Sequence, residues 1–533
     1  MSILDHKPLY FYYRYRFGSL LCFILALQIM GQSLSYAQIH PGQVPSPFKS
    51  ISQNSVSNMG SQGDTLWIGP RMNFNVGNQL DWNIPDGIDS VSAGRGRLFS
   101  IALAPDTIVA GIGYNDIRGD ESVQSQMGFY ISTDGGLTWM LSDTSRTLDK
   151  PDDTTVRYGG QDFQTIPVIV PQQSPPYMVD FRGDVIFFAG WASGIRRSTD
   201  FGRSWERIVL PPFELDELRP ELEYDFTIDP RGDGVTNNFL NFLGFSVLVA
   251  SDGNVYAGTA GGLNISDNAL FAPADSIRWR HIRAEQNPDG LLGNWITSIR
   301  ENPYDNGIWM TNWLAVTGSD TEGLVVTRDQ GQTFEQHLFG ERIYDIGFNG
   351  STIFATGNNG IFISGDNGGS WRQVRRISSA NTSMKPNATY YTAANTNGRV
   401  WIGSSDGLAS TVDDGKTWEI VRVDFPLDGK NRFQSNAPSV SSYAYPNPFS
   451  PRQHELVRIK FENQNASDVS IRLYDFGMNL VRILDEKKEL GPGTYEAVWD
   501  GTDQQGRKVA NGTIFYHIDV GGKRIVGKIL LLE

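Results

Sequence analysis

Cysteine and histidine are scarce in this sequence of 533 residues, which contains one Cys and six His. The single cysteine is Cys22, near the N-terminus, and the histidines are scattered so that no two of them share a helical turn. Zinc sites built from several cysteines or from paired histidines on a helix are therefore excluded. Disulfides are excluded as well, and we expect no metal and no cofactor.

Positive charge is in the minority. The sequence has 45 Lys and Arg against 59 Asp and Glu, which gives a formal net charge of -14. An acidic surface repels phosphate backbones, so a nucleic-acid partner is disfavoured. The hydrophobic fraction of 39% is typical of globular domains.

Long apolar runs are absent except near the N-terminus. Lys7, Arg14 and Arg16 precede the apolar run from Leu20 to Ile29, and Ser35-Tyr36-Ala37 supplies small residues for cleavage. This pattern predicts a secretory signal peptide over residues 1–37. The run is shorter than the roughly 20 residues that a membrane-spanning helix needs. We expect an exported protein that contacts a membrane, if at all, by surface attachment.

Amphipathic helical patterns are rare, whereas one octet recurs five times. The five copies are 132–139, 198–205, 327–334, 364–371 and 411–418. A stretched copy runs from Ser266-Asp267 to Trp279, and a decayed one ends at Asp81-Trp82. Each copy follows a β-rich run such as Val255–Thr259 and a Gly-containing turn. Four short strands per repeat predict an all-β fold, a seven-bladed β-propeller over residues 64–435 that follows an N-terminal segment at 38–63.

The chemistry of the octet suits a tight hairpin turn. Its Ser, Thr and Asp side chains can accept backbone N–H bonds, and its terminal aromatic residue can fill the wedge between neighbouring sheets. The octets resemble the Asp-box (BNR) repeat of sialidase-type propellers. The resemblance implies a structural role for the Asp and aromatic residue of each copy, namely Asp134, Trp139, Asp200, Trp205, Asp329, Phe334, Asp366, Trp371, Asp413 and Trp418.

A composition shift near Asn436 indicates a linker over residues 436–444, before a second β-rich domain at 445–533. Short alternating strands separated by Gly- and Asn-containing turns predict a small immunoglobulin-like β-sandwich. Tyr445-Pro-Asn-Pro-Phe449 and Trp499-Asp-Gly-Thr-Asp503 make this domain resemble the Ig-like domain of flagellar hook-capping (FlgD) proteins and the sorting domain of the type IX secretion system. The resemblance implies recognition by an export machinery, followed by surface attachment or release.

One motif has the residue spacing of a serine hydrolase motif. Gly403-Ser404-Ser405-Asp406-Gly407 has the spacing of a nucleophile elbow, which requires a strand-to-helix turn. Here the motif lies between two predicted strands, so we predict an ordinary hairpin turn.

The resemblance to sialidases raises the possibility of glycoside hydrolysis. The Arg-Ile/Leu-Pro signature expected near the start of a sialidase domain is missing. A hydrolase of another type would need two carboxylates across a cleft. The enlarged loops offer five candidates, Asp116, Asp120, Glu121, Asp320 and Glu322.

Binding without catalysis is the function that we favour. Three aromatic residues, Tyr114, Trp191 and Trp313, occupy turns where other repeats have small residues. Aromatic rings stack on sugars and anchor protein partners. The sequence therefore predicts an exported or cell-surface propeller that binds a glycan or an extracellular protein. A secreted glycoside hydrolase is the main alternative, and an assembly factor of the photosystem type is a third.

Overall fold

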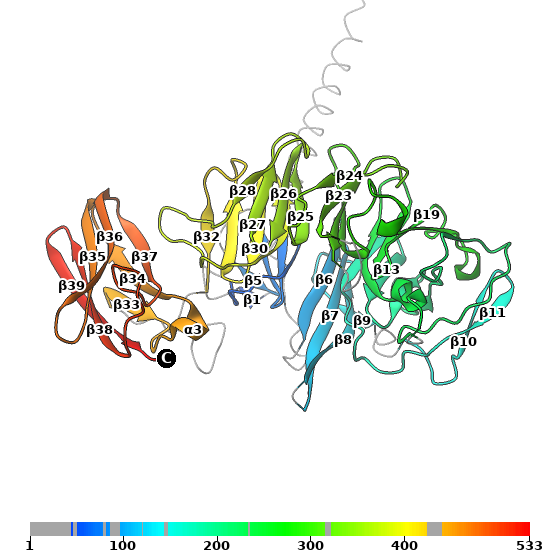
Figure 1. The fold of residues 1–533 in the computed structure, drawn as a ribbon, viewed down its shortest axis with the longest axis horizontal. Coiled ribbons are helices and arrows are strands. Elements are labelled where there is room, and N and C mark those ends of the chain that lie inside the picture. The colour runs from blue at the N-terminus through cyan, green and yellow to red at the C-terminus, as the bar shows by residue number, and fades with distance from the viewer. Residues whose placement is uncertain are drawn as a thin grey trace, which may run out of the picture. The chain divides into compact units, whose positions relative to one another are not determined.

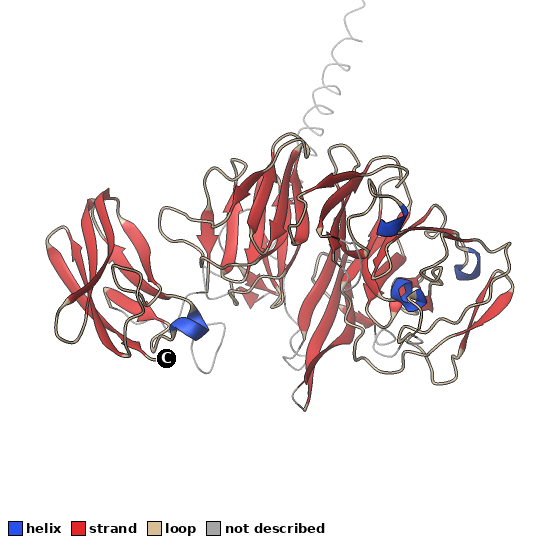
Figure 2. Cartoon of the chain, viewed as in Figure 1, coloured by secondary structure: helices blue, strands red, loops and turns tan. Residues whose placement is uncertain are grey.

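The computed structural model describes residues 44–45, 51–77, 82–85, 96–119, 121–142, 148–232, 235–314, 321–423 and 440–533. The predicted signal peptide, Asp81, Asp120, Asp320 and part of the predicted linker lie outside these ranges. Within them the chain is almost entirely β-structure (Figure 2). None of the described helices combines the length and apolar character needed to cross a membrane.

Seven antiparallel sheets of four or five strands follow one another from β1 to β32, and each is built from one continuous stretch of chain (Figure 1). The first three sheets contain β1 (Val44–Pro45), β2 (Asn58–Gln62), β3 (Thr65–Gly69), β4 (Asn73–Val76) and β5 (Asn83–Ile84); β6 (Arg97–Leu103), β7 (Ile108–Arg118), β8 (Glu121–Ser132) and β9 (Met140–Ser142); and β12 (Met178–Arg182), β13 (Val185–Gly190), β14 (Gly194–Ser198) and β15 (Glu206–Arg207). The hairpin of β10 (Thr155–Tyr158) and β11 (Gln161–Gln164) is inserted before the third sheet.

The remaining four sheets repeat this pattern. They contain β16 (Glu217–Leu218), β17 (Gly244–Val249), β18 (Val255–Thr259), β19 (Leu263–Ser266) and β20 (Trp279–Ile282); β21 (Trp295–Glu301), β22 (Ile308–Trp313), β23 (Gly323–Thr327) and β24 (Glu335–His337); β25 (Ile343–Asn349), β26 (Thr352–Gly357), β27 (Gly360–Ser364) and β28 (Arg372–Val374); and β29 (Tyr390–Thr396), β30 (Arg399–Ser404), β31 (Gly407–Thr411) and β32 (Glu419–Val421). Three 3-10 helices, η2 (Asn238–Phe242), η3 (Ala274–Ser276) and η4 (Ala284–Gln286), lie in the connections.

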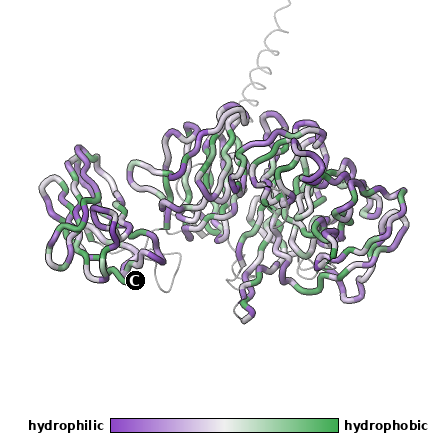
Figure 3. Tube along the Cα trace, viewed as in Figure 1, coloured by the Kyte–Doolittle hydropathy of each residue, from purple (hydrophilic) through white to green (hydrophobic). Residues whose placement is uncertain are grey.

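The sheets form a closed ring. The edge strands β2, β6, β12, β17, β21, β25 and β29 each contact the corresponding strands of the two neighbouring sheets, and β29 returns to β2. This arrangement is a β-propeller, as the sequence predicts. The next two strands of each sheet are buried on both faces, as in β18 and β23, because neighbouring sheets pack against each other. Apolar residues accordingly follow the strands, and hydrophilic residues follow the peripheral loops (Figure 3).

The ring closes where the first sheet meets the last. Val56 N donates to Ser404 O at 2.8 Å, and Gly407 N donates to Asn54 O at 2.7 Å. Trp82, directly before β5 of the first sheet, and Trp401 of the last sheet also pack edge to face, with ring centroids 6.0 Å apart. The ring therefore uses residues upstream of position 64, where the sequence predicted its start.

Residues 440–533 form a sandwich of two sheets, the fold that the sequence predicts, although β33 begins at Ser442, within the predicted linker at 436–444. One contains β33 (Ser442–Tyr445), β34 (Val457–Asn463) and β37 (Gly493–Trp499), and the other contains β35 (Ser467–Tyr474), β36 (Leu480–Leu490), β38 (Gly512–Val520) and β39 (Lys523–Leu531). The short helix α3 (Pro451–His454) joins β33 to β34. Ile471, Tyr516 and the fully buried Trp499 belong to the core between the sheets.

Candidate functional site

A bulge interrupts five of the seven edge strands at the same place. The pairing of each strand with the next slips by one residue between Leu98 and Ser100, Gly244 and Ser246, Ile296 and Ser298, Ile343 and Asp345, and Tyr390 and Thr392. A bulge leaves the extra residue unpaired and re-aims its side chain. The extra residues are Phe99, Phe245, Thr297, Tyr344 and Tyr391, so four of the five are aromatic.

All of these residues except Phe245 line a cavity in the middle of the ring. The cavity has a volume of about 110 Å³, and Phe99, Tyr177, Tyr344 and Tyr391 are among its lining residues. Each of these four rings is half-buried, with one part packed against protein and another part open. Six of the seven edge strands, or the residues just before them, contribute to the lining. We call this end of the channel the aromatic mouth.

Further aromatic rings extend the mouth outward in an arc. Phe245 lies 5.2 Å from Trp191 and 5.2 Å from Trp295, measured between ring centroids. Trp295 is the cross-strand partner of Trp313 in the sheet of β21 and β22. Trp313 in turn packs edge to face on Tyr344 at 5.3 Å. The rings thus follow one another across four neighbouring sheets, from the third to the sixth.

Polar residues form the floor of the mouth. Asp345 in β25 is buried, and its Oδ1 accepts hydrogen bonds from Arg300 Nε at 2.9 Å and from Ser298 Oγ at 3.1 Å. Its Oδ2 accepts from Thr392 Oγ1 at 2.7 Å and from Arg300 Nη2 at 3.3 Å. The carboxylate is therefore fully engaged and is neutralised by Arg300, an arrangement suited to holding three sheets together.

A second carboxylate lies deeper in the channel. Asp180 lines a cavity of about 380 Å³ together with Arg300 and Glu301. Burial raises the pKa of Asp180 to about 6, although the backbone N–H groups of Val249 and Phe181 and the charge of Arg300 act in the opposite direction. Val249 N donates to Asp180 Oδ2 at 2.7 Å, which links the third sheet to the fourth.

Two of the three predicted binding aromatics belong to the aromatic mouth. Trp191 and Trp313 lie in the arc, and Trp313 is fixed by a hydrogen bond of 2.6 Å from Nε1 to Ile343 O. Arg342 stacks over the Trp313 ring at 5.1 Å from its centroid. Tyr114 lies in the long hairpin of β7 and β8, opposite Ser125. None of the three predicted residues is among those that line the cavity itself.

The structure places Asp116 and Glu121 in one hairpin of the second sheet and Glu322 directly before β23 of the fifth sheet. Asp116 accepts from Arg118 Nε at 3.1 Å and from Gln172 Nε2 at 2.9 Å in the long hairpin. Glu121 is exposed near the tip of the same hairpin. Glu322 accepts from Arg342 Nε at 2.7 Å, beside Trp313. Within the described ranges, no group of three or more His, Cys, Asp or Glu residues is arranged to hold a metal ion.

The repeated octets lie between the third and fourth strands of their sheets and share one hydrogen-bond pattern. In the last copy, Asp413 Oδ1 accepts from Thr417 N at 2.9 Å and from Thr411 Oγ1 at 2.8 Å, and its Oδ2 accepts from Thr417 Oγ1 at 2.7 Å. These bonds, led by the one from the Thr417 backbone, lower the pKa of Asp413 to about 2. The other four copies repeat this set of three bonds around Asp134, Asp200, Asp329 and Asp366.

The aromatic residue of an octet packs against the preceding sheet. Trp205 of the third sheet lies 5.0 Å from Phe129 of the second sheet, and Trp371 of the sixth lies 6.3 Å from Trp309 of the fifth. In the stretched copy, Asn268 takes the place of the Asp, because its Oδ1 accepts from Ser266 Oγ at 3.1 Å and from Arg278 N at 2.9 Å.

A protein-family comparison bears on the sandwich. The family model of the FlgD Ig-like domain matches residues 453–524. The C-terminal sandwich is a FlgD Ig-like domain. No curated protein matches the sequence.

Several solved structures are similar to the chain. PorZ of Porphyromonas gingivalis, described as an essential surface component of the type IX secretion system, is 12% identical with a TM-score of 0.38, over 90% of this chain and 66% of PorZ. A GH74 enzyme of Niastella koreensis is 12% identical with a TM-score of 0.42, over 92% and 75% of the two chains. YCF48 of Cyanidioschyzon merolae is 16% identical with a TM-score of 0.35, over 61% and 85%. At scores this low, the similarities say nothing about function.

Sequence reasoning missed most of the mouth. Phe245, Trp295, Tyr344 and Tyr391 were not predicted, nor was the pair of Arg300 and Asp345. A sequence signal exists, because the triplets 98–100, 244–246, 343–345 and 390–392 each place an aromatic residue before Ser, Thr or Asp. These triplets precede the octets by several strands, so a search centred on the octets passes over them.

Proposed function

We propose that this chain is an exported β-propeller protein that binds a carbohydrate chain at the aromatic mouth without cleaving it. The observation that carries the proposal is the arc of half-buried rings from Trp191 to Tyr391, in which Tyr344 and Tyr391 also line the central cavity. Such rings offer apolar faces on which sugar rings stack. Packing against neighbouring rings holds them in place, so little side-chain entropy is lost on binding.

Two of the carboxylates near the mouth, Asp345 and Glu322, favour binding over hydrolysis. Glycoside hydrolysis uses two carboxyl groups, one of which must carry or accept a proton at the scissile bond. Asp345 is held by Arg300, Ser298 and Thr392 through both of its oxygens, and Glu322 is paired with Arg342. Both act as counter-ions of arginines, which suits a structural role.

The two ends of the chain support a proposal about export. A signal peptide at residues 1–37 would carry the chain across the inner membrane, and the FlgD Ig-like domain would serve as a type IX sorting domain. In a bacterium with that system, we expect the full chain at the cell surface or in the medium. A chain without residues 445–533 should remain in the periplasm, and equal export of both forms would contradict the proposal.

Affinity electrophoresis on gels that contain single polysaccharides tests the binding proposal. We expect the purified chain to be retarded by at least one of them, and Trp191→Ala and Trp313→Ala to lose the retardation. Tyr304→Ala provides a matched control, because Tyr304 is 62% exposed and the described lining of the mouth does not include it. Free migration on every gel would contradict carbohydrate binding, and release of reducing sugar by the chain would establish the hydrolase instead.

A further inference from the structure

The turn between β30 and β31 buries a carboxylate. It is the turn of the Gly403–Gly407 motif, and it joins two strands, as the sequence predicts. Asp406 is 4% exposed, and its Oδ2 accepts from Lys385 N at 2.8 Å. A Cβ at Gly407 would lie 2.8 Å from Val421 O, so only glycine fits beside it without displacing the backbone. The turn is thus packed tightly against the end of the last sheet.

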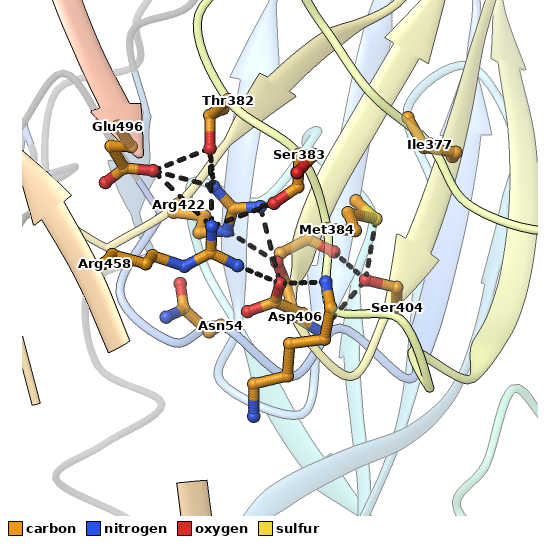
Figure 4. Close-up of polar contacts among 12 residues, drawn as sticks. Asn54, Ile377, Thr382, Ser383, Met384, Ser404, Asp406, Arg422, Arg458 and Glu496 are labelled. Carbon is orange, nitrogen blue, oxygen red and sulfur yellow. Dashed lines mark hydrogen bonds and ion pairs between the residues drawn. The ribbon is translucent and has the colours of Figure 1, made fainter. Parts of the chain in front are cut away.

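The charges that face Asp406 come from both domains (Figure 4). Arg422, just after β32 of the propeller, lies 3.4 Å from Asp406 Oδ2 through Nη2, and Arg458 of β34 in the sandwich donates to the same oxygen. Arg422 Nη1 also donates to Glu496 Oε2 of β37 at 3.1 Å. Two arginines and two carboxylates therefore alternate across the contact, and their formal charges cancel.

Neutral groups satisfy the remaining hydrogen bonds of this cluster. Thr382 Oγ1 donates to Glu496 Oε2 at 2.7 Å, and Arg458 Nη1 donates to Ser383 O at 2.8 Å. Tyr445, the first residue of the Tyr-Pro-Asn-Pro-Phe motif, donates its hydroxyl to Glu496. Side-chain exposure is 4% for Arg458 and 13% for Glu496. Charges this buried are retained at a high desolvation cost, and they fix geometry when all their partners are present.

The same turn also carries the closure of the propeller ring. Gly407, next to Asp406, donates its N–H to Asn54 O, and Ser404 accepts from Val56 N. Val423, next to Arg422, donates its N–H to Asn54 Oδ1 at 2.8 Å. The residues that contact the sandwich, Asp406 and Arg422, are therefore direct sequence neighbours of Gly407 and Val423, which bond the last sheet to the first.

We propose that the C-terminal sandwich stabilises the junction between the first and last sheets of the propeller through Arg458 and Glu496. We call this role the clasp. Each propeller sheet is built from one continuous stretch of chain, so the first and last sheets are joined by side-chain packing and the bonds to Asn54 and Val56. Opening of the ring at this junction requires movement of the turn at 404–407 and of the chain at 422–423. The sandwich restrains both segments at once. This role is independent of what the aromatic mouth binds.

Hydrogen exchange on the full chain tests the clasp. In Arg458→Met, we expect the amides of Val56, Gly407 and Val423 to exchange at least ten times faster than in the parent chain. Ile471 and Ile518 amides in the sandwich core should be unchanged, which would show that the sandwich remains folded. The matched control is Arg472→Met, which removes an exposed ion pair of the same domain, with Glu486 at 2.9 Å. It should leave all these amides unchanged.

Unchanged exchange at Val56 and Gly407 in Arg458→Met would overturn the clasp. If all amides of that variant exchange rapidly, the measurement is repeated on Glu496→Gln, because this substitution removes one charge and keeps the shape of the side chain. Faster exchange at Val56 and Gly407, with protected sandwich amides, would then support the clasp. Any other pattern in Glu496→Gln would overturn it.

Discussion

Arg300 of β21 and Asp345 of β25 join two neighbouring sheets of the propeller by a two-pronged ion pair, with Nε to Oδ1 at 2.9 Å and Nη2 to Oδ2 at 3.3 Å. Asp345 also accepts from Thr392 of the next sheet along the ring. One carboxylate thereby connects three sheets at the floor of the aromatic mouth. Its removal should affect stability and binding together.

We expect Asp345→Ala to lower the free energy of unfolding by about 2 kcal/mol, because Arg300 loses its counter-ion while it remains partly exposed to water. Urea denaturation measures this loss. The control is Asp116→Ala, which removes a partly exposed ion pair with Arg118 and a hydrogen bond from Gln172, and which should cost under about 1 kcal/mol. Equal losses in the two variants would show that the ion pair in the channel stabilises the fold no more than the ion pair of the exposed hairpin does.

Asp180 should make stability depend on pH in a direction unusual for a carboxyl group. Its pKa is about 6 in the folded chain, above the value of about 3.9 for an unfolded Asp. The folded state therefore binds more protons between pH 4 and 6, and this contribution to stability grows as pH falls through that window. We expect a gain of about 1–2 kcal/mol. Asp180→Asn, which keeps an acceptor for Val249 N, should remove this gain in denaturation curves at pH 4 and 6. If the difference in free energy of unfolding between the parent and Asp180→Asn does not vary with pH, the raised pKa of Asp180 is contradicted.

In the stretched octet, the neighbouring residues Asn268 and Asp267 have different roles. Asn268→Ala should lower the free energy of unfolding by about 1–2 kcal/mol, because Ser266 Oγ and Arg278 N lose their acceptor. Asp267→Ala should change it by less than about 0.5 kcal/mol, because the pair of Asp267 with Arg278 is exposed and 3.4 Å long. Thermal or urea denaturation of both variants measures the contrast. The reverse order would mean that Asp267 holds the turn.

The mouth predicts which aromatic residues bind a carbohydrate. Tyr391→Ala should weaken retention on the binding polysaccharide at least fivefold, since a ring contact is worth about 1 kcal/mol or more. Tyr114→Ala should weaken retention less, because the long hairpin holds Tyr114 outside the described lining of the cavity. Affinity electrophoresis at several polysaccharide concentrations gives the dissociation constant of each variant. A larger loss in Tyr114→Ala would move the binding site onto that hairpin.

Local patterns in the sequence were sufficient for the fold. The octets repeat Ser or Thr, Asp and Gly at fixed positions, and bonds such as Thr417 N to Asp413 Oδ1 form within a few residues of chain. The hairpin at Gly403–Gly407 and the sandwich fold of the FlgD Ig-like domain were predicted for the same reason. Turn chemistry and strand alternation act over short distances, so one sequence suffices to recognise them.

Tertiary structure decided the site and the contact between the domains. Tyr344 and Tyr391 meet because bulges on two edge strands turn both rings toward one axis, and Arg300 reaches Asp345 across 45 positions of sequence. Asp406 and Arg458 are 52 positions apart, and nothing in either local sequence marks them as partners. The sequence by itself determined the strands, the turns and the kind of domain, because those depend on neighbours along the chain. The closing of the ring and the docking of the sandwich determined which side chains share a cavity or a charge cluster, because those depend on neighbours in space.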